Sequence, residues 1–179
     1  DFSGLNKYIS RVQSFLQQGM ADNDVLLYFP VFDRYADYGR GLLEHFDAIS
    51  PAFNGTPLKT AADEMIKKGY GFDYISDLQL VNTMSLDGLL HTAGNVYGTL
   101  VVPGCKYIPV ETFSHILRLA NEGVKVIFLG DLPENISGWA DAEEKTAFFE
   151  SLRSGIHFSP SNNPRVMKCS YGKGSLLSG

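Results

Sequence analysis

The chain has 179 residues, of which 44% are hydrophobic and 20% charged, as is typical of one globular domain with its own core. Its 15 basic and 20 acidic residues give a net charge of −5, which argues against a nucleic-acid or anionic-membrane surface because both require clustered lysine and arginine. No apolar run approaches the roughly 20 residues that a membrane-spanning helix needs.

The start of the chain predicts an amphipathic helix followed by a buried strand. The apolar residues of the helix recur at helical spacing: Leu5, Tyr8, Ile9, Val12, Phe15 and Leu16. Gly19 provides a helix end, since glycine tolerates the left-handed conformation there. Residues 25–29 are apolar without alternation, as expected for a strand covered on both faces, and Pro30 ends the strand.

The middle of the chain predicts a second helix, a strand and a hairpin. Thr56-Pro57 begins the helix, because threonine caps well and proline suits the first helical position. Its predicted buried stripe is Leu58, Ala61, Ala62, Met65 and Ile66, and Gly69 ends it. A short strand follows at 72–75. Residues 89–92 and 96–102 predict a hairpin turning at Gly94-Asn95, with a buried strand at 99–102.

The last third predicts two helices, another buried strand and a final hairpin. One helix runs from Pro109 to Gly123, and the buried strand follows at 124–129. The second helix spans 141–154, and its predicted buried residues are Ala142, Phe148, Phe149 and Leu152. Residues 165–171 and 175–177 predict an antiparallel hairpin around residues 172–174.

Strands that alternate with helices predict βαβ units with right-handed crossovers. The predicted fold class is therefore α/β: a three-layer flavodoxin-like domain with a mostly parallel sheet, helices on both faces and hairpins at the edges. We expect residues 1–179 to form a single domain. Since the sequence begins at Asp1 without a methionine and ends in residues that read like an unfinished strand, we also expect a piece of a longer protein.

Several segments resemble one family of large bacterial enzymes. Residues 8–12 (YISRV), 16–19 (LQQG) and 24–30 (DVLLYFP) resemble the opening of a domain in glycoside hydrolase family 106 α-L-rhamnosidases. Residues 69–75 (GYGFDYI), and 100–103 (LVVP) with the proline-started helix after them, resemble later segments of that domain. The same architecture resembles the glutamine-amidotransferase-like trimerisation domain of family 42 β-galactosidases.

The resemblance implies an accessory domain without chemistry of its own. The family's catalytic carboxylates lie on a barrel, and no residue here matches them. The implied partner is therefore the catalytic barrel of a parent chain, and the implied location is periplasmic or extracellular. A homo-oligomerisation role, as in the trimerisation domains, stays open as an alternative.

The main candidate contact site is the predicted loop after the first strand. It contains Phe32, Asp33, Arg34, Tyr35, Asp37 and Tyr38. Tyrosines stack on sugar rings, and aspartate and arginine hydrogen-bond to hydroxyls, so carbohydrate contact is one interpretation. Tyrosine and arginine are also enriched at protein interfaces, so contact with another domain is the other interpretation.

Cys105 suggests an alternative function, a standalone small-molecule-binding or cysteine-dependent hydrolase domain. It follows a buried strand, and His115 lies ten residues later. However, the G-x-S/C-x-G pattern of a nucleophile elbow is incomplete here, and His115 is expected on a helix surface. Cys105 and Cys169 form a disulfide only if the fold brings them together.

No cofactor or metal is predicted. The loop after the first strand lacks the glycine, serine and threonine that a phosphate site needs. The aspartates Asp22, Asp24, Asp33 and Asp37 do not have EF-hand spacing, and the four histidines are dispersed. Trp139, together with Phe148 and Phe149, is expected in the core or at an interface and not as a platform for a sugar ring.

Overall fold

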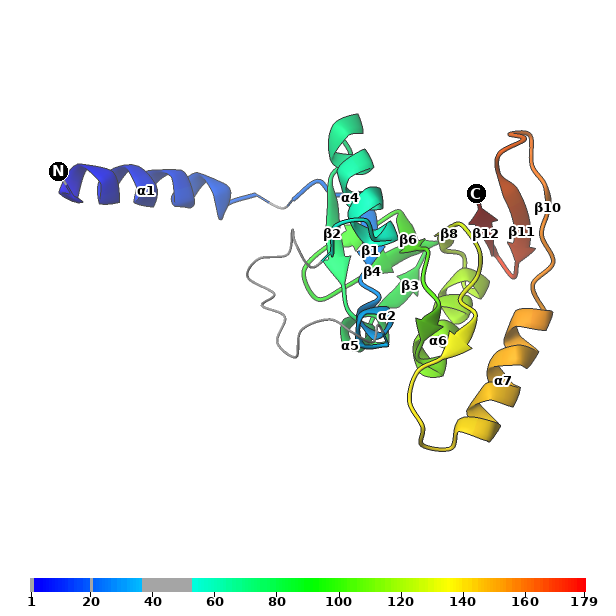
Figure 1. Ribbon diagram of the computed structural model, residues 1–179. Helices are drawn as coiled ribbons and strands as arrows, with labels where there is room; N and C mark the ends of the chain where they lie inside the picture. Colours follow the sequence, from blue (N-terminus) through cyan, green and yellow to red (C-terminus); the bar gives the residue numbers. More distant parts are fainter. Residues whose placement is uncertain (1, 20, 37–52) are drawn as a thin grey trace.

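The computed structural model describes residues 2–19, 21–36 and 53–179 (Figure 1). These residues form a mixed α/β fold around a seven-stranded, mostly parallel sheet with the strand order β10-β11-β12-β8-β6-β1-β2. The strands, in chain order, are β1 (Val25–Tyr28), β2 (Phe72–Ile75), β6 (Thr99–Pro103), β8 (Lys125–Leu129), β10 (Ser159–Pro160), β11 (Met167–Tyr171) and β12 (Gly174–Ser178). The predicted strands at 25–29, 72–75, 99–102 and 124–129 are thus confirmed.

The final hairpin enters the sheet instead of only lining its edge. β11 and β12 pair antiparallel, as predicted, but β12 also pairs in parallel with β8. This leaves β11 and the short β10 as the antiparallel strands at that edge. Gly174, the first residue of β12, lets this strand begin close to the end of α6 and the start of β8. A Cβ at this position would lie 2.4 Å from the backbone oxygens of Ala120 and Val124.

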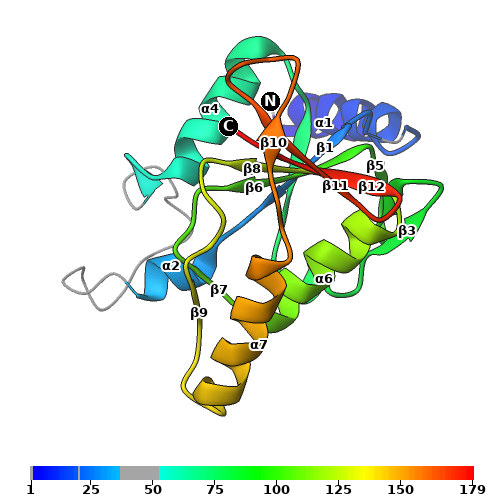
Figure 2. The ribbon, with the colours of Figure 1, turned by 90° about the vertical axis from the view of Figure 1, so that its right-hand side faces the viewer.

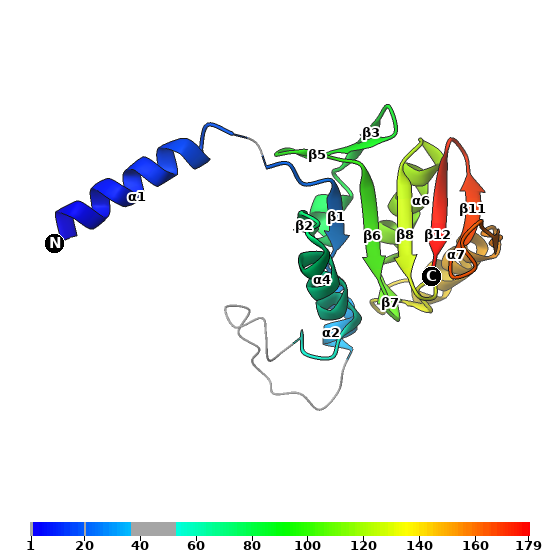
Figure 3. The same cartoon turned by 90° about the horizontal axis from the view of Figure 1, so that it is seen from above.

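Alternate residues of the central strands pack on opposite faces of the sheet. Leu26, Leu100 and Val126 belong to one buried cluster, which includes residues of α5 (Asp77–Leu80), α6 (Val110–Asn121) and α7 (Ala142–Ser154). Leu27 and Val101 belong to the other cluster, with residues of α4 (Pro57–Lys68). In Figure 3, α4 lies in front of the sheet, whereas α6 lies behind it. The lack of polar alternation in these strands therefore reflects burial on both sides.

The helices predicted at 57–68, 109–122 and 141–154 are confirmed, but two of the residues predicted to be buried in them are exposed. Thr56 caps α4 by accepting the N–H of Lys59, and Gly69 ends it with φ +79°. However, Ile66 on α4 is exposed, and so is Phe148 on α7, while Phe149 beside it is buried. Both helices therefore bury a narrower stripe than their apolar residues predict.

A second, three-stranded sheet lies beside the amino ends of the main strands. It consists of β3 (Met84–Leu86), β4 (Leu89–His91) and β5 (Val96–Tyr97), all antiparallel. The β4–β5 hairpin is the predicted one, and β3 is an addition. One face of this sheet buries Leu90 and Tyr97, and the other exposes Met84, Leu86 and Leu89.

The helix α1 (Phe2–Leu16) forms as predicted but contacts no core. None of its residues is buried, and Phe15 is 72% exposed. Figures 1 and 3 show it projecting away from the sheet. Its apolar stripe is therefore left without a partner inside the described residues.

Candidate functional site

Three chain segments meet at the carboxyl ends of β1, β6 and β8. The first is α2 (Val31–Tyr35), which follows β1. The second and third carry β7 (Tyr107–Ile108) after β6 and β9 (Asn135–Ile136) after β8, and these two strands pair in parallel. Figure 2 shows α2, β7, β9 and α7 at the same end of the molecule. This is the sheet edge at which open α/β folds place their ligands.

The predicted loop at residues 32–38 begins instead as a helix. β1 ends at Tyr28, and α2 starts at Val31, directly after Pro30, with the N–H of Ala36 donating to the carbonyl of Phe32 at 3.0 Å. The prediction was wrong because proline was read only as a strand end, although it also suits a helix start. Asp37 and Tyr38 lie outside the described residues.

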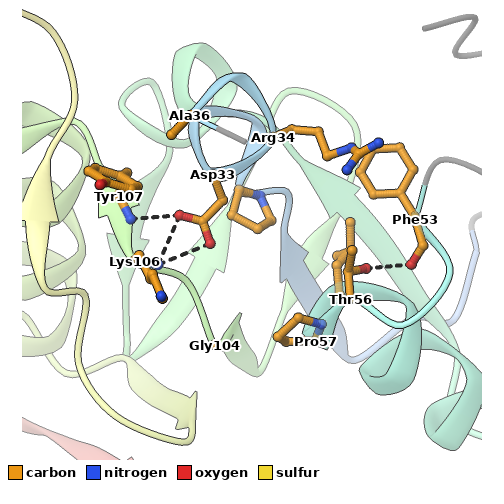
Figure 4. A pocket seen from close by; sticks show the side chains of 11 residues that line it. Asp33, Arg34, Ala36, Phe53, Thr56, Pro57, Gly104, Lys106 and Tyr107 are labelled. Carbon is orange, nitrogen blue, oxygen red and sulfur yellow. Dashed lines mark hydrogen bonds between the residues drawn. The ribbon is translucent and has the colours of Figure 1, made fainter. Parts of the chain in front are cut away.

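Asp33 fixes α2 to the neighbouring segment (Figure 4). Its carboxylate accepts the backbone N–H of Lys106 at 2.8 Å and that of Tyr107 at 2.6 Å. A carboxylate that satisfies two backbone donors has a structural role in the folded chain. Asp33 thus positions the site rather than offering both oxygens to a ligand.

A pocket of about 370 Å³ lies between α2, the start of α4 and the segment after β6 (Figure 4). Asp33 and Lys106 line one part of it, and Phe53 and Thr56 line another. The guanidinium of Arg34 lies 5.3 Å from the centre of the Phe53 ring, within cation–π range. Two of the predicted contact residues, Asp33 and Arg34, therefore belong to this pocket.

A larger groove, of about 520 Å³, lies on the other side of α2. It is bordered by the other two described contact residues, Phe32 and Tyr35, and by residues of β7, β9 and α7. We call this surface the aromatic groove and define it by Tyr35, Tyr107, Glu134, Asn135, Trp139 and Glu150.

Trp139 in the aromatic groove is 93% exposed, so it does not pack in the core, whereas its expected place at an interface stays a prediction. Gly138 before it has φ +92°, a conformation that favours glycine, and the turn it makes precedes α7. The sequence reading did not assign Tyr107, Glu134, Asn135, Trp139 or Glu150 to a site. The sequence did contain a signal for Trp139, because Gly138-Trp139 lies in the segment after a buried parallel strand, and such segments lie at the ligand-binding edge of an open α/β sheet.

Cys105 lies under this edge in an environment that does not activate a thiol. The side chain is buried, and both cysteines are free. Burial, together with the nearby carboxylates of Asp33 and Asp77, raises the pKa of the Cys105 thiol to about 12. No hydrogen bond joins it to a histidine within the described residues. These features argue against a cysteine nucleophile.

Asp77 connects two buried hydroxyl groups below the same edge. Its Oδ1 accepts the hydroxyl of Tyr28 at 2.7 Å and that of Thr112 at 2.7 Å. Burial and the adjacent Asp77 carboxylate raise the pKa of the Tyr28 phenol. This network joins β1, α5 and α6 and is consistent with a structural role.

His115 is buried, in contrast to the expected position on the surface of its helix. It lies on α6, and its ring Nε2 is 3.1 Å from the carbonyl oxygen of Thr83. Since a carbonyl only accepts, Nε2 carries the proton, and Nδ1 faces the guanidinium of Arg118 at 3.2 Å. Burial and the neighbouring Arg118 lower the pKa of His115.

The described residues contain no cluster of three histidine, cysteine or acidic side chains placed to hold a metal ion. Among the helices of the same residues, none combines the length and the apolarity needed to cross a membrane.

Comparison with solved structures found similar folds inside glycoside hydrolases. The rhamnosidase from Novosphingobium sp. PP1Y superposes with a TM-score of 0.60 and 18% identity, over 96% of this chain and 14% of that one. The GH42 β-galactosidase Gan42B from G. stearothermophilus, as its E323A catalytic mutant, gives a TM-score of 0.53 and 11% identity, over 89% and 27%.

The exo-β-1,4-mannosidase Op5Man5 from Opitutaceae bacterium strain TAV5 gives a TM-score of 0.50 and 12% identity, over 98% of this chain and 34% of that one. The chain therefore spans between 14% and 34% of these larger proteins. At these identities the comparisons establish a shared fold. No family model and no curated protein matches the sequence.

Proposed function

We propose that this chain is a non-catalytic accessory domain of a larger glycoside hydrolase of the α-L-rhamnosidase type. The observation that carries the proposal is that nearly the whole chain, 96%, superposes on 14% of a rhamnosidase chain. The segments at residues 8–30 and 69–75, which resemble family 106 enzymes, point to the same parent. By that resemblance the parent is exported to the periplasm or beyond.

The topology supports a flavodoxin-like or amidotransferase-like arrangement for this domain. Its five parallel strands follow the order β2-β1-β6-β8-β12, and numbering these strands along the chain gives 2-1-3-4-5, the flavodoxin-like order. The two buried clusters on opposite faces of the sheet fit a three-layer organisation. The activated thiol that an amidotransferase needs is missing at Cys105, which supports a role without catalysis.

The exposed stripe of α1 supports packing against another part of the parent chain. Tyr8, Phe15 and Leu16 are each more than 60% exposed, so their apolar surface is unburied in the isolated domain. An exposed apolar stripe of this kind usually marks an interaction site. We propose that α1 packs on the catalytic barrel and that Arg34, at the carboxyl ends of the strands, contributes to interdomain contacts.

The reading frame that encodes this chain provides the first test. It should contain a barrel-sized segment with two carboxylates placed for glycoside hydrolysis. The 179-residue chain alone should release no nitrophenol from nitrophenyl α-L-rhamnoside, β-mannoside or β-galactoside. Turnover by the isolated chain would refute a non-catalytic role.

Packing through α1 is tested by calorimetric titration of the barrel segment with the 179-residue chain. We expect binding, and we expect the Phe15→Ser variant to bind more weakly because it loses apolar contact area. Lys7→Ser, on the polar side of the same helix, is the matched control and should bind as the unchanged chain does. Equal affinities for all three forms would exclude α1 as the contact.

A second candidate function is self-association, favoured by the exposed face of the three-stranded sheet. Met84 and Leu86 on this face are both more than half exposed, so a second copy has apolar surface to cover. Sedimentation over a range of concentrations separates the two functions. A concentration-dependent dimer or trimer of the isolated chain would favour oligomerisation over intrachain packing.

A further inference from the structure

The aromatic groove has the features of a ligand site, although the packing proposed for α1 does not use it. It lies between α2 and the β9–α7 segment, and its volume of about 520 Å³ is within the usual range for small-molecule sites. Two large aromatic rings border it with most of their surface in solvent: Tyr35 is 69% exposed and Trp139 is 93% exposed.

We propose that the aromatic groove binds a neutral saccharide. Trp139 and Tyr35 provide the flat apolar surfaces on which the C–H faces of a sugar ring stack. Glu134, Asn135 and Glu150 provide acceptors and donors for its hydroxyl groups. No reaction is proposed at this site.

Both rings are open to solvent at the border of the groove. Phe32 packs edge-to-face against Tyr35, with ring centroids 6.2 Å apart, and so supports the Tyr35 ring from one side. Trp139 has no aromatic ring paired with it within the described residues. An isolated, exposed indole suits stacking on a sugar ring better than it suits a closed aromatic cage around a cation.

The polar lining of the groove selects against charged anions. Glu134 and Glu150 are both carboxylates, and no lysine or arginine lines the groove. A phosphate or uronate would be repelled at such a surface, whereas uncharged hydroxyls can donate to the carboxylates. The adjacent pocket differs in this respect, because Arg34 and Lys106 line it.

Backbone hydrogen bonds hold the floor of the groove in place before a ligand arrives. The N–H groups of Glu134 and Asn135 both donate to the carbonyl of Lys106, at 3.0 and 2.8 Å. The N–H of Ser137 donates to the carbonyl of Ile108 at 3.2 Å. A prearranged floor lowers the entropic cost of binding, as a site for a weakly held sugar requires.

This inference adds a ligand to the proposed function but does not depend on it. The groove lies within this one chain, so saccharide binding needs neither the barrel nor contacts through α1. The two proposals therefore fail independently: absence of a barrel in the reading frame leaves the groove untouched, and absence of sugar binding leaves the packing untouched.

Fluorescence of Trp139 tests the proposal directly, because it is the only tryptophan in the chain. The full 179-residue chain is titrated with methyl α-L-rhamnoside, β-1,4-mannobiose and β-1,4-galactobiose, and in separate experiments with choline and glucose 1-phosphate. We expect a saturable change in emission with at least one neutral sugar, with a Kd on the order of 1 mM, and none with glucose 1-phosphate.

The Tyr35→Ala variant keeps the Trp139 reporter and should bind the same sugar about five-fold more weakly, since it loses one stacking surface. Tyr70→Ala is the matched control, since Tyr70 is similarly exposed but lies outside the groove. In saturation-transfer NMR, Trp139→Ala should abolish the signal of the bound sugar. Both rings are exposed, so these variants should retain the circular dichroism spectrum of the unchanged chain.

Three results would overturn the proposal. The first is the absence of saturable binding with all three sugars. The second is equal sugar affinity of the Tyr35→Ala and Tyr70→Ala variants. The third is tighter binding of choline than of any sugar, which would assign the groove to a cation instead.

Discussion

The carboxylate of Asp33 accepts the backbone N–H of Tyr107, 74 residues later in the sequence, at 2.6 Å. This bond joins α2 to the beginning of β7, and Tyr107 lines both the pocket and the aromatic groove on the two sides of α2. Asp33, one of the predicted contact residues, therefore holds in place the helix that carries three others, Phe32, Arg34 and Tyr35.

Replacing Asp33 should destabilise this edge. Asp33→Ala leaves the N–H groups of Lys106 and Tyr107 without their acceptor, so we expect the free energy of unfolding to fall by about 1–3 kcal/mol. Asp33→Asn retains one oxygen acceptor and should lose less. Urea denaturation followed by circular dichroism measures both changes.

The exposed Asp131 provides the control for this prediction, and Asp131→Ala should change stability by less than about 0.5 kcal/mol. If Asp33→Ala unfolds at the same urea concentration as Asp131→Ala, the bonds to β7 contribute nothing and α2 is held by other contacts.

Replacing Asp77, which accepts hydrogen bonds from Tyr28 and Thr112, should destabilise the fold more than replacing Asp33. Both donors are almost fully buried, so Asp77→Ala leaves two hydroxyl groups without an acceptor, at a cost of about 1–3 kcal/mol each. Tyr28→Phe removes one donor together with its need for a partner and should cost less. A double-mutant cycle between Tyr28→Phe and Asp77→Ala should give a coupling energy, and additive effects would contradict the network.

The central sheet was predictable because its signals are local. The apolar runs that became β1, β6 and β8 are long enough to mark buried strands, and the helix end at Gly69 depends on one residue with a positive φ. The hairpin between β3 and β4 also had a local signal, Asp87-Gly88, both with positive φ, and this signal was overlooked.

The surfaces were less predictable, because burial depends on which elements meet. An apolar stripe identifies α1 as a helix but does not reveal that the stripe lies outside the core. Phe148 looks like a core residue in the sequence, yet α7 packs on α6 with Phe149 buried and leaves Phe148 exposed. In the candidate site, Phe32 and Tyr35 were named from the sequence, whereas their partners on β7, β9 and α7 required the folded chain.

Cys105 should react slowly with iodoacetamide at neutral pH. Burial and the neighbouring carboxylates raise its pKa to about 12, so the thiolate that reacts is scarce and shielded in the folded state. Labelling should become fast in denaturant, and mass spectrometry of the peptide that contains Cys105 separates it from Cys169. Rapid labelling of the native chain at Cys105 would revive the hydrolase alternative.

Because of the raised pKa of Cys105, we expect the folded chain to become less stable in alkaline solution. The pKa of this thiol is higher in the folded than in the unfolded chain, so between about pH 9 and pH 12 the unfolded chain has released a proton that the folded chain retains. The free energy of unfolding should therefore decrease as the pH rises through this window. Cys105→Ala should reduce the decrease without removing it, because the pKa of Tyr28 is also raised.

Because of His115, we expect the free energy of unfolding to decrease as the pH falls in the acidic range. The pKa of this histidine is lowered from 6.5 by burial and by Arg118, so as the pH falls below about 6.5 the unfolded chain binds a proton at this position before the folded chain does. The contribution of His115 to stability is therefore present above this pH and is lost as the pH decreases.

Urea denaturation at several pH values from 7.5 to 5 measures the slope of the free energy of unfolding against pH. His115→Gln should flatten it, whereas His157→Gln, at an exposed position, should leave it as in the unchanged chain. If both variants retain the full slope, the proton responsible for it binds at a group other than His115.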